Sequence, residues 1–236
     1  MAGDVERATR LFEEAIAAAD ELAYVRCTAH AELGCLAALE GDHQRAHQHQ
    51  RAATELATTT GVRDSTAMVA NAAGLTARFR EDAYEAKASH LRALAVFQEL
   101  GSEIGIAYVR CCLGYADRHL GHATAASRHF GDALTLARKT GRSDIMAAAL
   151  EGLACLAAPH DADSSARLLG AARRIRDDTG IRLTMIEGHD PREAERHART
   201  VLGTEHFAAA ADTGKHSSLE EVLPLLTTPG ALRSAP

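Results

Sequence analysis

The amino-acid sequence predicts an all-α protein, a right-handed superhelical solenoid of antiparallel helix hairpins closed by a C-terminal helical cap. The first observation is a regular spacing of glycines over the first 180 residues. The second is that apolar residues between them recur at i, i+3, i+4 and i+7, as on one face of an amphipathic helix. The third is composition: 46 % of residues are hydrophobic but only 4 % aromatic, which suits closely packed helices better than sheets. The regular glycines are Gly41, Gly61, Gly101, Gly121, Gly141 and Gly180, and Glu81-Asp82 takes the vacant place between Gly61 and Gly101.

Four similar segments begin 40 residues apart, at positions 33, 73, 113 and 153, and indicate a repeat. Gly34, Gly74 and Gly114 lie in phase inside predicted helices, where glycine costs about 1 kcal/mol relative to alanine. We therefore expect the backbone of a neighbouring helix to approach closely at these positions. A small residue follows twelve positions later in each copy: Ala46, Ala86, Ala126 and Ala166.

Each copy places a small residue in a first helix, a turn after it, and small or aromatic residues in a second helix. The clearest copy contains Leu113-Gly114, Gly121, Ala126, Phe130 and Ala133. This pattern resembles the tetratricopeptide repeat. The period is longer than the usual 34 residues, so we expect each helix to be about one turn longer. HEAT-like repeats have similar lengths, but the glycine and alanine positions favour the tetratricopeptide-like interpretation.

The predicted organisation follows from these positions. A half-repeat is expected at 1–22, and residues 181–226 lack the period and are expected to form a helical capping segment. Such a cap covers the apolar face that the last repeat would otherwise expose. The tail at 227–236 is expected to be disordered. The full hairpins are predicted at about 23–61, 62–101, 102–141 and 142–180.

Local signals predict where individual helices begin and end. Asp82-x-x-Glu85 is typical of a capping box that begins a helix. In the cap, Pro191 suits the first helical position, and Gly203 is expected to end that helix. Ser217-x-x-Glu220 predicts a further capping box before the last apolar segment.

Residues 166–225 carry a second pattern, which includes ARLLGAA at 166–172, Leu202-Gly203, Gly214 and SLEE at 218–221. It resembles the C-terminal ending of bacterial LuxR-type and AfsR-like STAND transcriptional regulators. The resemblance implies a sensor or interaction arm that restrains an upstream ATPase and a helix-turn-helix DNA-binding domain. This sequence has no G-x-x-x-x-G-K-[ST] phosphate loop and no DNA-binding helix pair. We therefore expect it to be either a fragment of a longer regulator or a stand-alone relative that has lost those domains.

Charge and cysteine usage narrow the function classes further. The net charge of −6 argues against a broad phosphate-binding face, so we expect no direct nucleic-acid binding. The five cysteines are odd in number, form no C-x-x-C pair and fall in apolar segments, as is typical of reduced thiols in a cytoplasmic protein. The N-terminal residues include acids where a signal peptide would have a basic region followed by an apolar one, and no apolar run is long enough to span a membrane. We therefore expect neither a signal peptide nor a membrane span.

Two segments rich in histidine or charged residues are candidates for a metal site and for an anion contact. His43, His47 and His49 lie within seven positions, but only the first two share a helical face, so a metal site would need ligands from another helix. We expect a polar outer face there and no metal site or cofactor. In AARRIRDD at 171–178, pairs between Arg173 and Asp177 and between Arg174 and Asp178 predict a solvated surface, with an anion contact as the alternative.

A catalytic site is not predicted, because no acid–base or nucleophile set converges. Cys111 and His119 share a helical face with Tyr115 but lie two turns apart, about 12 Å, too far for proton transfer. First helices of such hairpins line a concave groove, and tyrosine and arginine are enriched at binding hot spots. The alternative is that the tyrosines pack between hairpins. The predicted groove residues are Met68, Asn71, Leu75, Arg78, Tyr108, Cys111, Tyr115, Arg118 and Glu151.

The sequence thus predicts a non-catalytic binding module, acting as the regulatory or interaction arm of a bacterial transcriptional regulator. The expected occupant of the groove is a protein, a peptide or a small effector. The alternative function is a self-associating scaffold. In that case Leu11, Phe12 and Ile16 on the first helix would pair with a second copy, because no earlier helix covers them.

Overall fold

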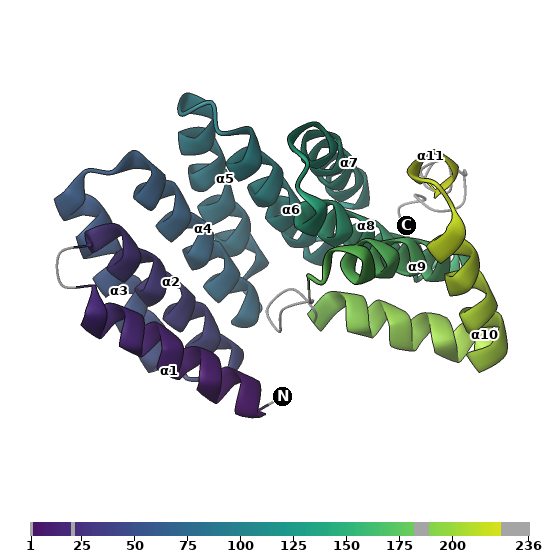
Figure 1. The fold of residues 1–236 in the computed structure, drawn as a ribbon, viewed down its shortest axis with the longest axis horizontal. Coiled ribbons are helices and arrows are strands. Elements are labelled where there is room, and N and C mark those ends of the chain that lie inside the picture. Colours follow the sequence, from purple (N-terminus) through teal and green to yellow (C-terminus); the bar gives the residue numbers. More distant parts are fainter. Residues whose placement is uncertain (1, 20–21, 182–188, 223–236) are drawn as a thin grey trace. The chain divides into compact units, whose positions relative to one another are not determined.

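The structure is a computed structural model, and it describes residues 2–19, 22–181 and 189–222 (Figure 1). The described residues form helices joined by short turns, which confirms the predicted all-α fold of helix hairpins. The hairpin helices are fifteen to eighteen residues long. In order they are α1 Ala2–Ala18, α2 Ala23–Leu39, α3 His43–Thr60, α4 Arg63–Phe79, α5 Ala83–Glu99, α6 Glu103–His119, α7 Ala123–Thr140, α8 Ser143–Ala157, α9 Ala162–Thr179, α10 His189–His216 and α11 Leu219–Val222.

The chain divides into two compact units, Met1–Ala116 and Asp117–Pro236, which are described separately below. In the first unit, α2 packs on α1, α3 and α4, and α4 packs on α3 and α5. In the second, α8 packs on α7, α9 and α10, and α9 packs on α10 and α11. The predicted division into an array at 1–180 and a cap at 181–226 stays a prediction, and the tail at 227–236 lies outside the described residues.

The turns inside the hairpins share one backbone conformation. Gly41 and Gly121 have φ values of 81° and 77°, and Glu81 takes the equivalent place with φ 60°. Among the described residues, Glu81 is the only one other than glycine with a positive φ. A left-handed conformation costs a residue with a Cβ about 1–2 kcal/mol, so this turn is strained where the glycine is replaced.

An aspartate after the turn then begins the second helix. The carboxylate of Asp42 accepts a hydrogen bond from the Arg45 backbone N–H at 3.0 Å, and that of Asp82 accepts from the Glu85 N–H at 2.9 Å. The Asp82 contact is one half of the predicted capping box; the other half is not formed, because the Asp82 N–H donates to the Ala77 carbonyl. The Glu85 carboxylate accepts hydrogen bonds from Ser89 and Arg92, both at 2.9 Å.

Gly34 and Gly74 of the repeat lie where the two helices of one hairpin meet. A Cβ added at Gly34 would lie 3.4 Å from the backbone oxygen of Ala46 on α3, which agrees with the predicted close approach of a helix backbone. At Gly74 the reason differs: the His90 imidazole occupies the space, and a Cβ there would lie 2.5 Å from its Nδ1. The four in-phase alanines, Ala46, Ala86, Ala126 and Ala166, are at most 1 % exposed.

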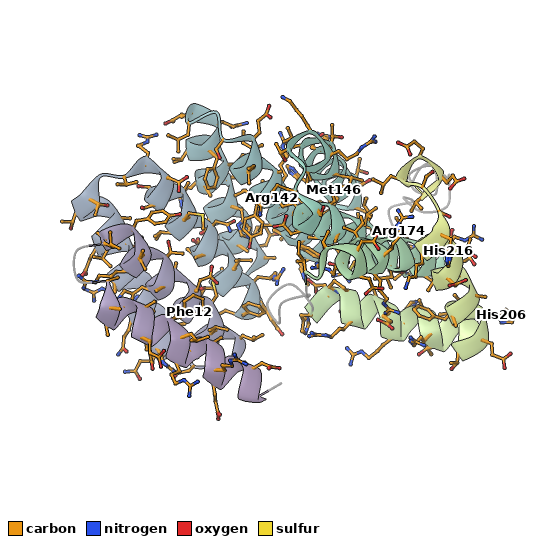
Figure 2. All side chains as sticks on the ribbon, viewed as in Figure 1. Phe12, Arg142, Met146, Arg174, His206 and His216 are labelled. Atoms are coloured by element: carbon orange, nitrogen blue, oxygen red, sulfur yellow. The ribbon has the colours of Figure 1, made fainter. Side chains whose placement is uncertain are left out.

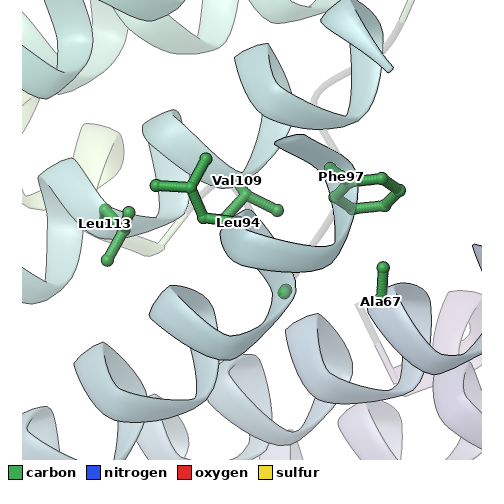
Figure 3. Packing of buried hydrophobic residues seen from close by; sticks show 6 residues of the cluster. Ala67, Leu94, Phe97, Val109 and Leu113 are labelled. Atoms are coloured by element: carbon green, nitrogen blue, oxygen red, sulfur yellow. The ribbon is translucent and has the colours of Figure 1, made fainter. Parts of the chain in front are cut away.

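The core of the first unit is built from modest apolar side chains. Phe97 and Leu94 on α5 pack against Val109 and Leu113 on α6 and Ala67 on α4 (Figure 3). Each is less than a tenth exposed, and fully burying such a side chain contributes about 1.5–3 kcal/mol. This cluster holds α4, α5 and the first part of α6 together.

In the second unit, α10 is two helical segments joined at a bend (Figure 1). Gly203 has φ 75° and ψ 166° inside it, which agrees with the predicted helix end at this residue. The last capping box is one residue further along than predicted. Glu221 N–H donates to Ser218 Oγ at 3.3 Å, and Ser218 N–H donates to Glu221 Oε2 at 2.7 Å, because α11 begins at Leu219.

Two glycines let α9 and the second segment of α10 cross closely. A Cβ at Gly170 on α9 would lie 2.7 Å from the carbonyl carbon of Ala211, and a Cβ at Gly214 would lie 2.5 Å from that of Arg167. Backbone carbonyls cannot rotate away as side chains can. Any residue larger than glycine at these positions would therefore force the two helices apart.

Candidate functional site

The three histidines of α3 lie in two environments: two face solvent, and His49 lies at the contact between α2 and α3. His43 and His47 are exposed, whereas His49 Nδ1 lies 3.0 Å from Nδ1 of His30 on α2. Burial lowers the pKa of both His30 and His49, so the pair is held neutral with one nitrogen donating to the other. Within the described ranges, no group of three or more His, Cys, Asp or Glu residues is arranged to hold a metal ion.

The predicted groove residues of the first unit fall into two sets. Met68, Arg78 and Tyr108 are partly exposed, on α4 and α6. The guanidinium of Arg78 lies 5.4 Å from the ring centre of Tyr115, a cation–π contact between the two helices. A buried side chain cannot offer its surface to a ligand, so such residues support the face from below. The buried set is Asn71, Leu75, Cys111 and Tyr115, each at most 7 % exposed.

Asn71 has a structural partner that the sequence did not indicate. Its Oδ1 lies 2.9 Å from Nδ1 of His90 on α5, and His90 is 1 % exposed. Burial, together with the nearby Arg78, lowers the pKa of His90 to about 3. The imidazole is therefore neutral at pH 7 and donates its proton to the amide oxygen. This pair is an internal polar contact of the α4–α5 hairpin.

The cysteines are poor nucleophiles in this fold. All five are free and buried. Burial raises the pKa of Cys27, Cys35 and Cys155, so these sulfurs remain protonated thiols at neutral pH. Cys111 is 3 % exposed, which leaves a substrate no access to its sulfur.

In the second unit, Arg118 at the end of α6 lies next to the beginning of α10. Its Nη1 lies 3.6 Å from the carboxylate of Asp190, and Nε2 of His119 lies 3.3 Å from the same oxygen. Asp190 is 2 % exposed. The Arg118 side chain is 21 % exposed. It therefore forms a largely internal ion pair with Asp190 and offers only a small part of its surface to a ligand.

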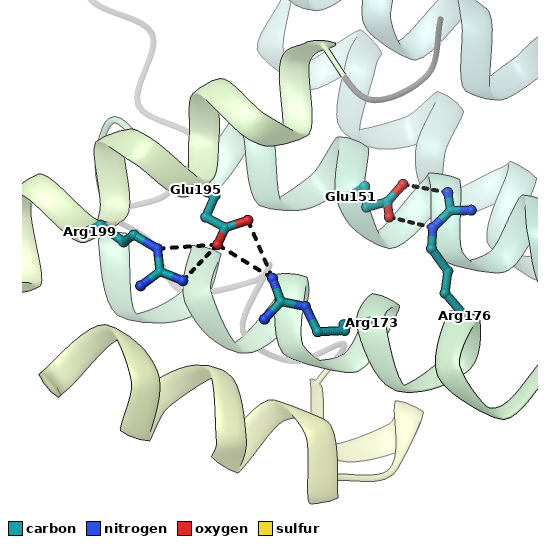
Figure 4. Close-up of polar contacts among 5 residues, drawn as sticks. All are labelled: Glu151, Arg173, Arg176, Glu195 and Arg199. Carbon is teal, nitrogen blue, oxygen red and sulfur yellow. Dashed lines mark hydrogen bonds and ion pairs between the residues drawn. The ribbon is translucent and has the colours of Figure 1, made fainter. Parts of the chain in front are cut away.

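Glu151, the last predicted groove residue, forms a buried ion pair with Arg176. Arg176 Nε donates to one carboxylate oxygen at 2.7 Å and Nη2 to the other at 2.8 Å, linking α8 to α9 (Figure 4). The side chains are 6 % and 10 % exposed. Bidentate pairing of this kind fixes both side chains in one orientation.

A second ionic group joins α9 to α10. Glu195 on α10 accepts from Arg199, one turn further along, at 2.8 Å and from Arg173 on α9 at 3.4 Å (Figure 4). The predicted pairs within residues 171–178 are therefore wrong. Arg173 pairs with Glu195, Arg174 donates to the Ser217 carbonyl at 2.7 Å, and Asp177 pairs with Lys215 at 3.1 Å. The packing of α10 on α9 supplies partners that an isolated helix lacks.

These two ionic groups border a small cavity of about 140 Å³, which we call the arginine pocket. It lies among α8, α9 and the first segment of α10, entirely within the second unit. The sequence indicated Glu151 as a groove residue and an anion contact within residues 171–178 as an alternative, but no sequence pattern indicated that these residues share one cavity. The lining residues are Glu151, Leu169, Arg173, Arg176, Pro191, Arg192 and Glu195.

Similarity to known proteins supports the fold. No protein-family model matches the chain, and no curated protein matches it in sequence. The chain is similar in structure to BtubC (BKLC) from P. vanneervenii, with a TM-score of 0.61 and 17 % identity. The alignment covers 98 % of this chain and 96 % of BtubC. At this identity the likeness shows the shared all-α helical-repeat fold, packed like tetratricopeptide repeats.

No helix in the described parts of the chain is long and apolar enough to cross a membrane.

Proposed function

We propose that this protein is a non-catalytic binding module whose partner is a segment of another protein. The observation that carries the proposal is the repeat fold, in which α2 and α4, the first helices of successive hairpins, pack on each other. Repeat arrays of this kind use their extended surfaces for binding. The buried, protonated thiols support the non-catalytic role.

The proposed contact face in the first unit is formed by Met68 and Arg78 on α4 and Tyr108 on α6, supported from below by Tyr115. These side chains combine an apolar group, a cation and an aromatic ring at partly exposed positions. Arginine and tyrosine contribute strongly to protein interfaces because each combines a large contact area with polar groups. The Arg78–Tyr115 contact holds the guanidinium in place before a partner arrives.

A photo-crosslinking experiment tests this face. A photoreactive phenylalanine analogue replaces Tyr108 in one variant and Tyr84 in a matched control. Tyr84 lies on α5 and is 77 % exposed. We expect a partner to be captured from the Tyr108 position and lost when Arg78→Ala is added. Equal capture from both positions, or capture from Tyr84 alone, would show that the face is wrong.

The biological setting that we propose is the regulatory arm of a bacterial transcriptional regulator. It is supported by the resemblance of residues 166–225 to the endings of LuxR-type and AfsR-like regulators. The test is the natural reading frame and its neighbours. An ATPase or helix-turn-helix domain on the same polypeptide would support this setting, and a natural protein without either domain would contradict it.

Self-association through α1 is the second candidate function. Leu11 is 51 % exposed, whereas Phe12, midway along α1 (Figure 2), and Ile16 are half-buried. Leu22 and Tyr24, at the beginning of α2, are also exposed, by 62 % and 49 %. Light scattering across a concentration series tests this: a dimer that Leu11→Glu dissociates supports it, and a monomer throughout excludes it.

A further inference from the structure

We propose that the arginine pocket of the second unit binds a single carboxylate group attached to a short aliphatic chain. This site is independent of the contact face on α4 and α6, because every residue that lines it belongs to α8, α9 or α10. Three arginines, two glutamates and two apolar residues meet around the cavity.

The ion pairs in the structure leave one lining arginine available. Arg176 is occupied by Glu151, and Arg173 shares Glu195 with Arg199. Arg192 is exposed, and it has no ion-pair partner among the described residues. It lies in the first turn of α10, where the helix dipole adds positive potential. The pocket therefore offers an anion one guanidinium that is not engaged by a carboxylate of the described residues.

The charge of the lining favours a monoanion. Three arginines against two glutamates leave a net charge of +1, which one carboxylate balances. A doubly charged phosphate would place a second negative charge close to Glu151 and Glu195. Guanidinium and carboxylate also match in geometry, since two parallel N–H groups meet two oxygens.

The remaining lining residues indicate what carries the carboxylate. Leu169 and Pro191 are buried apolar residues at the cavity and offer contact to a few methyl or methylene groups. The volume of about 140 Å³ is below that of pockets for drug-sized ligands, about 300–1,000 Å³. One amino-acid-sized group with a free carboxylate fits these limits.

Two arginines of the site differ in how firmly they are held. The Glu151–Arg176 pair is buried and bidentate, so it forms a rigid wall on α8 and α9. The Arg173–Glu195 contact is longer, at 3.4 Å, and Arg173 is half-exposed. Glu195 keeps Arg199 if Arg173 moves, so Arg173 is able to turn toward a ligand without leaving a carboxylate unpaired.

Calorimetric titration of the full chain with N-acetyl-leucine tests the proposal. We expect a dissociation constant in the millimolar range, as for a fragment with one ion pair. The neutral analogue N-acetyl-leucine amide should bind at least about tenfold more weakly, and inorganic phosphate should not compete at equal concentration. Equal binding of acid and amide, tighter binding of phosphate, or no heat of binding with about 50 mM N-acetyl-leucine would overturn the proposal.

Two matched variants connect that binding to the pocket. Arg192→Ala removes the available guanidinium, and we expect affinity for N-acetyl-leucine to fall at least about tenfold. Arg196→Ala removes an exposed arginine one turn further along the same helix, outside the lining, and should change affinity less than about twofold. Circular dichroism checks that both variants stay folded. Equal losses in the two variants would mean that binding reflects surface charge in general, and the proposal would fail.

A capped tetrapeptide, N-acetyl-Ala-Ala-Ala-Leu with a free C-terminus, separates the two sources of such a group. Tighter binding of the tetrapeptide than of N-acetyl-leucine assigns the pocket to the C-terminus of a protein chain. Weaker or equal binding assigns it to a free small carboxylic acid. Both results require the Arg192→Ala loss described above.

Discussion

Alanine at Gly170 or Gly214 should destabilise the second unit, although alanine is the better helix former. Gly170 lies in the middle of α9 and Gly214 in the second segment of α10, and both are buried. Their lack of a Cβ is what allows the two helices to cross closely. Substituting either glycine therefore tests how closely α9 and the second segment of α10 pack.

The magnitude follows from the contacts. A Cβ at Gly170 would lie 2.7 Å from the Ala211 carbonyl carbon, whereas ordinary contacts begin at 3.4 Å. The helices would have to separate by about 1 Å, and overpacking on this scale costs about 1–3 kcal/mol or more. The higher helix propensity of alanine relative to glycine offsets about 1 kcal/mol of this cost. We expect a net loss of about 2 kcal/mol in the free energy of unfolding for each variant.

The assay is urea unfolding followed by circular dichroism, with thermal melts in parallel. A loss of about 2 kcal/mol corresponds to a fall in Tm of about 4–8 °C for a protein of this size. Gly131→Ala on α7 is the matched control: nothing lies within 4 Å of the added Cβ, so propensity alone should stabilise the protein by up to about 1 kcal/mol. The double variant at Gly170 and Gly214 should lose less than the sum of the single losses, because one separation of the helices relieves both overlaps.

The refuting result is equally definite. If Gly170→Ala stabilised the protein as much as Gly131→Ala, then α9 and the second segment of α10 would not cross at this distance. Strict additivity of the two losses would show that the glycines act at separate contacts.

Three further predictions concern strain, burial and charge. Glu81→Gly should stabilise the protein by about 0.5–1 kcal/mol in urea unfolding, because glycine adopts the left-handed turn freely, whereas Glu40→Gly at a right-handed position should destabilise it; a loss in both would contradict the strained turn. The pKa of His90 is lowered to about 3 in the folded state, so the unfolded state binds more protons below pH 6.5. The free energy of unfolding should therefore fall by about 2 kcal/mol between pH 7 and pH 5. His90→Gln should make the free energy of unfolding less dependent on pH in this range, and an unchanged dependence would contradict the lowered pKa of His90. Arg176→Met should cost about 3–5 kcal/mol in urea unfolding because it removes the bidentate partner of the buried Glu151 carboxylate. Adding Glu151→Met should recover part of the loss, and no recovery would show that the pair is not the cause.

Much of the fold could be predicted from the sequence because its determinants are local. A helix depends on hydrogen bonds four residues apart, and a turn depends on a residue that accepts a positive φ. Asp42 and Asp82 cap helices through backbone groups three residues away. Gly41 and Gly121 adopt the turn conformation expected of them. The alanines of the repeat are buried as the period required.

The candidate sites depend on contacts that no local pattern specifies. Nothing in the spacing of Arg173 indicates that its partner is Glu195, 22 positions away, because the pair exists only where α10 packs on α9. For the same reason the interpretation of Gly74 was wrong in detail: the close neighbour is the ring of His90. Predicted groove positions such as Asn71 also proved to be buried, in this case against His90 on the second helix of the same hairpin.

The sequence by itself therefore determined the helices, their turns and the 40-residue period of this protein, since these follow from interactions between residues near in the chain. Only the tertiary structure decided which charges pair, which glycines allow helices to cross, and which arginine remains available in the pocket. Those outcomes depend on how helix faces meet, and a one-residue rotation of a helix, about 100°, would replace every partner.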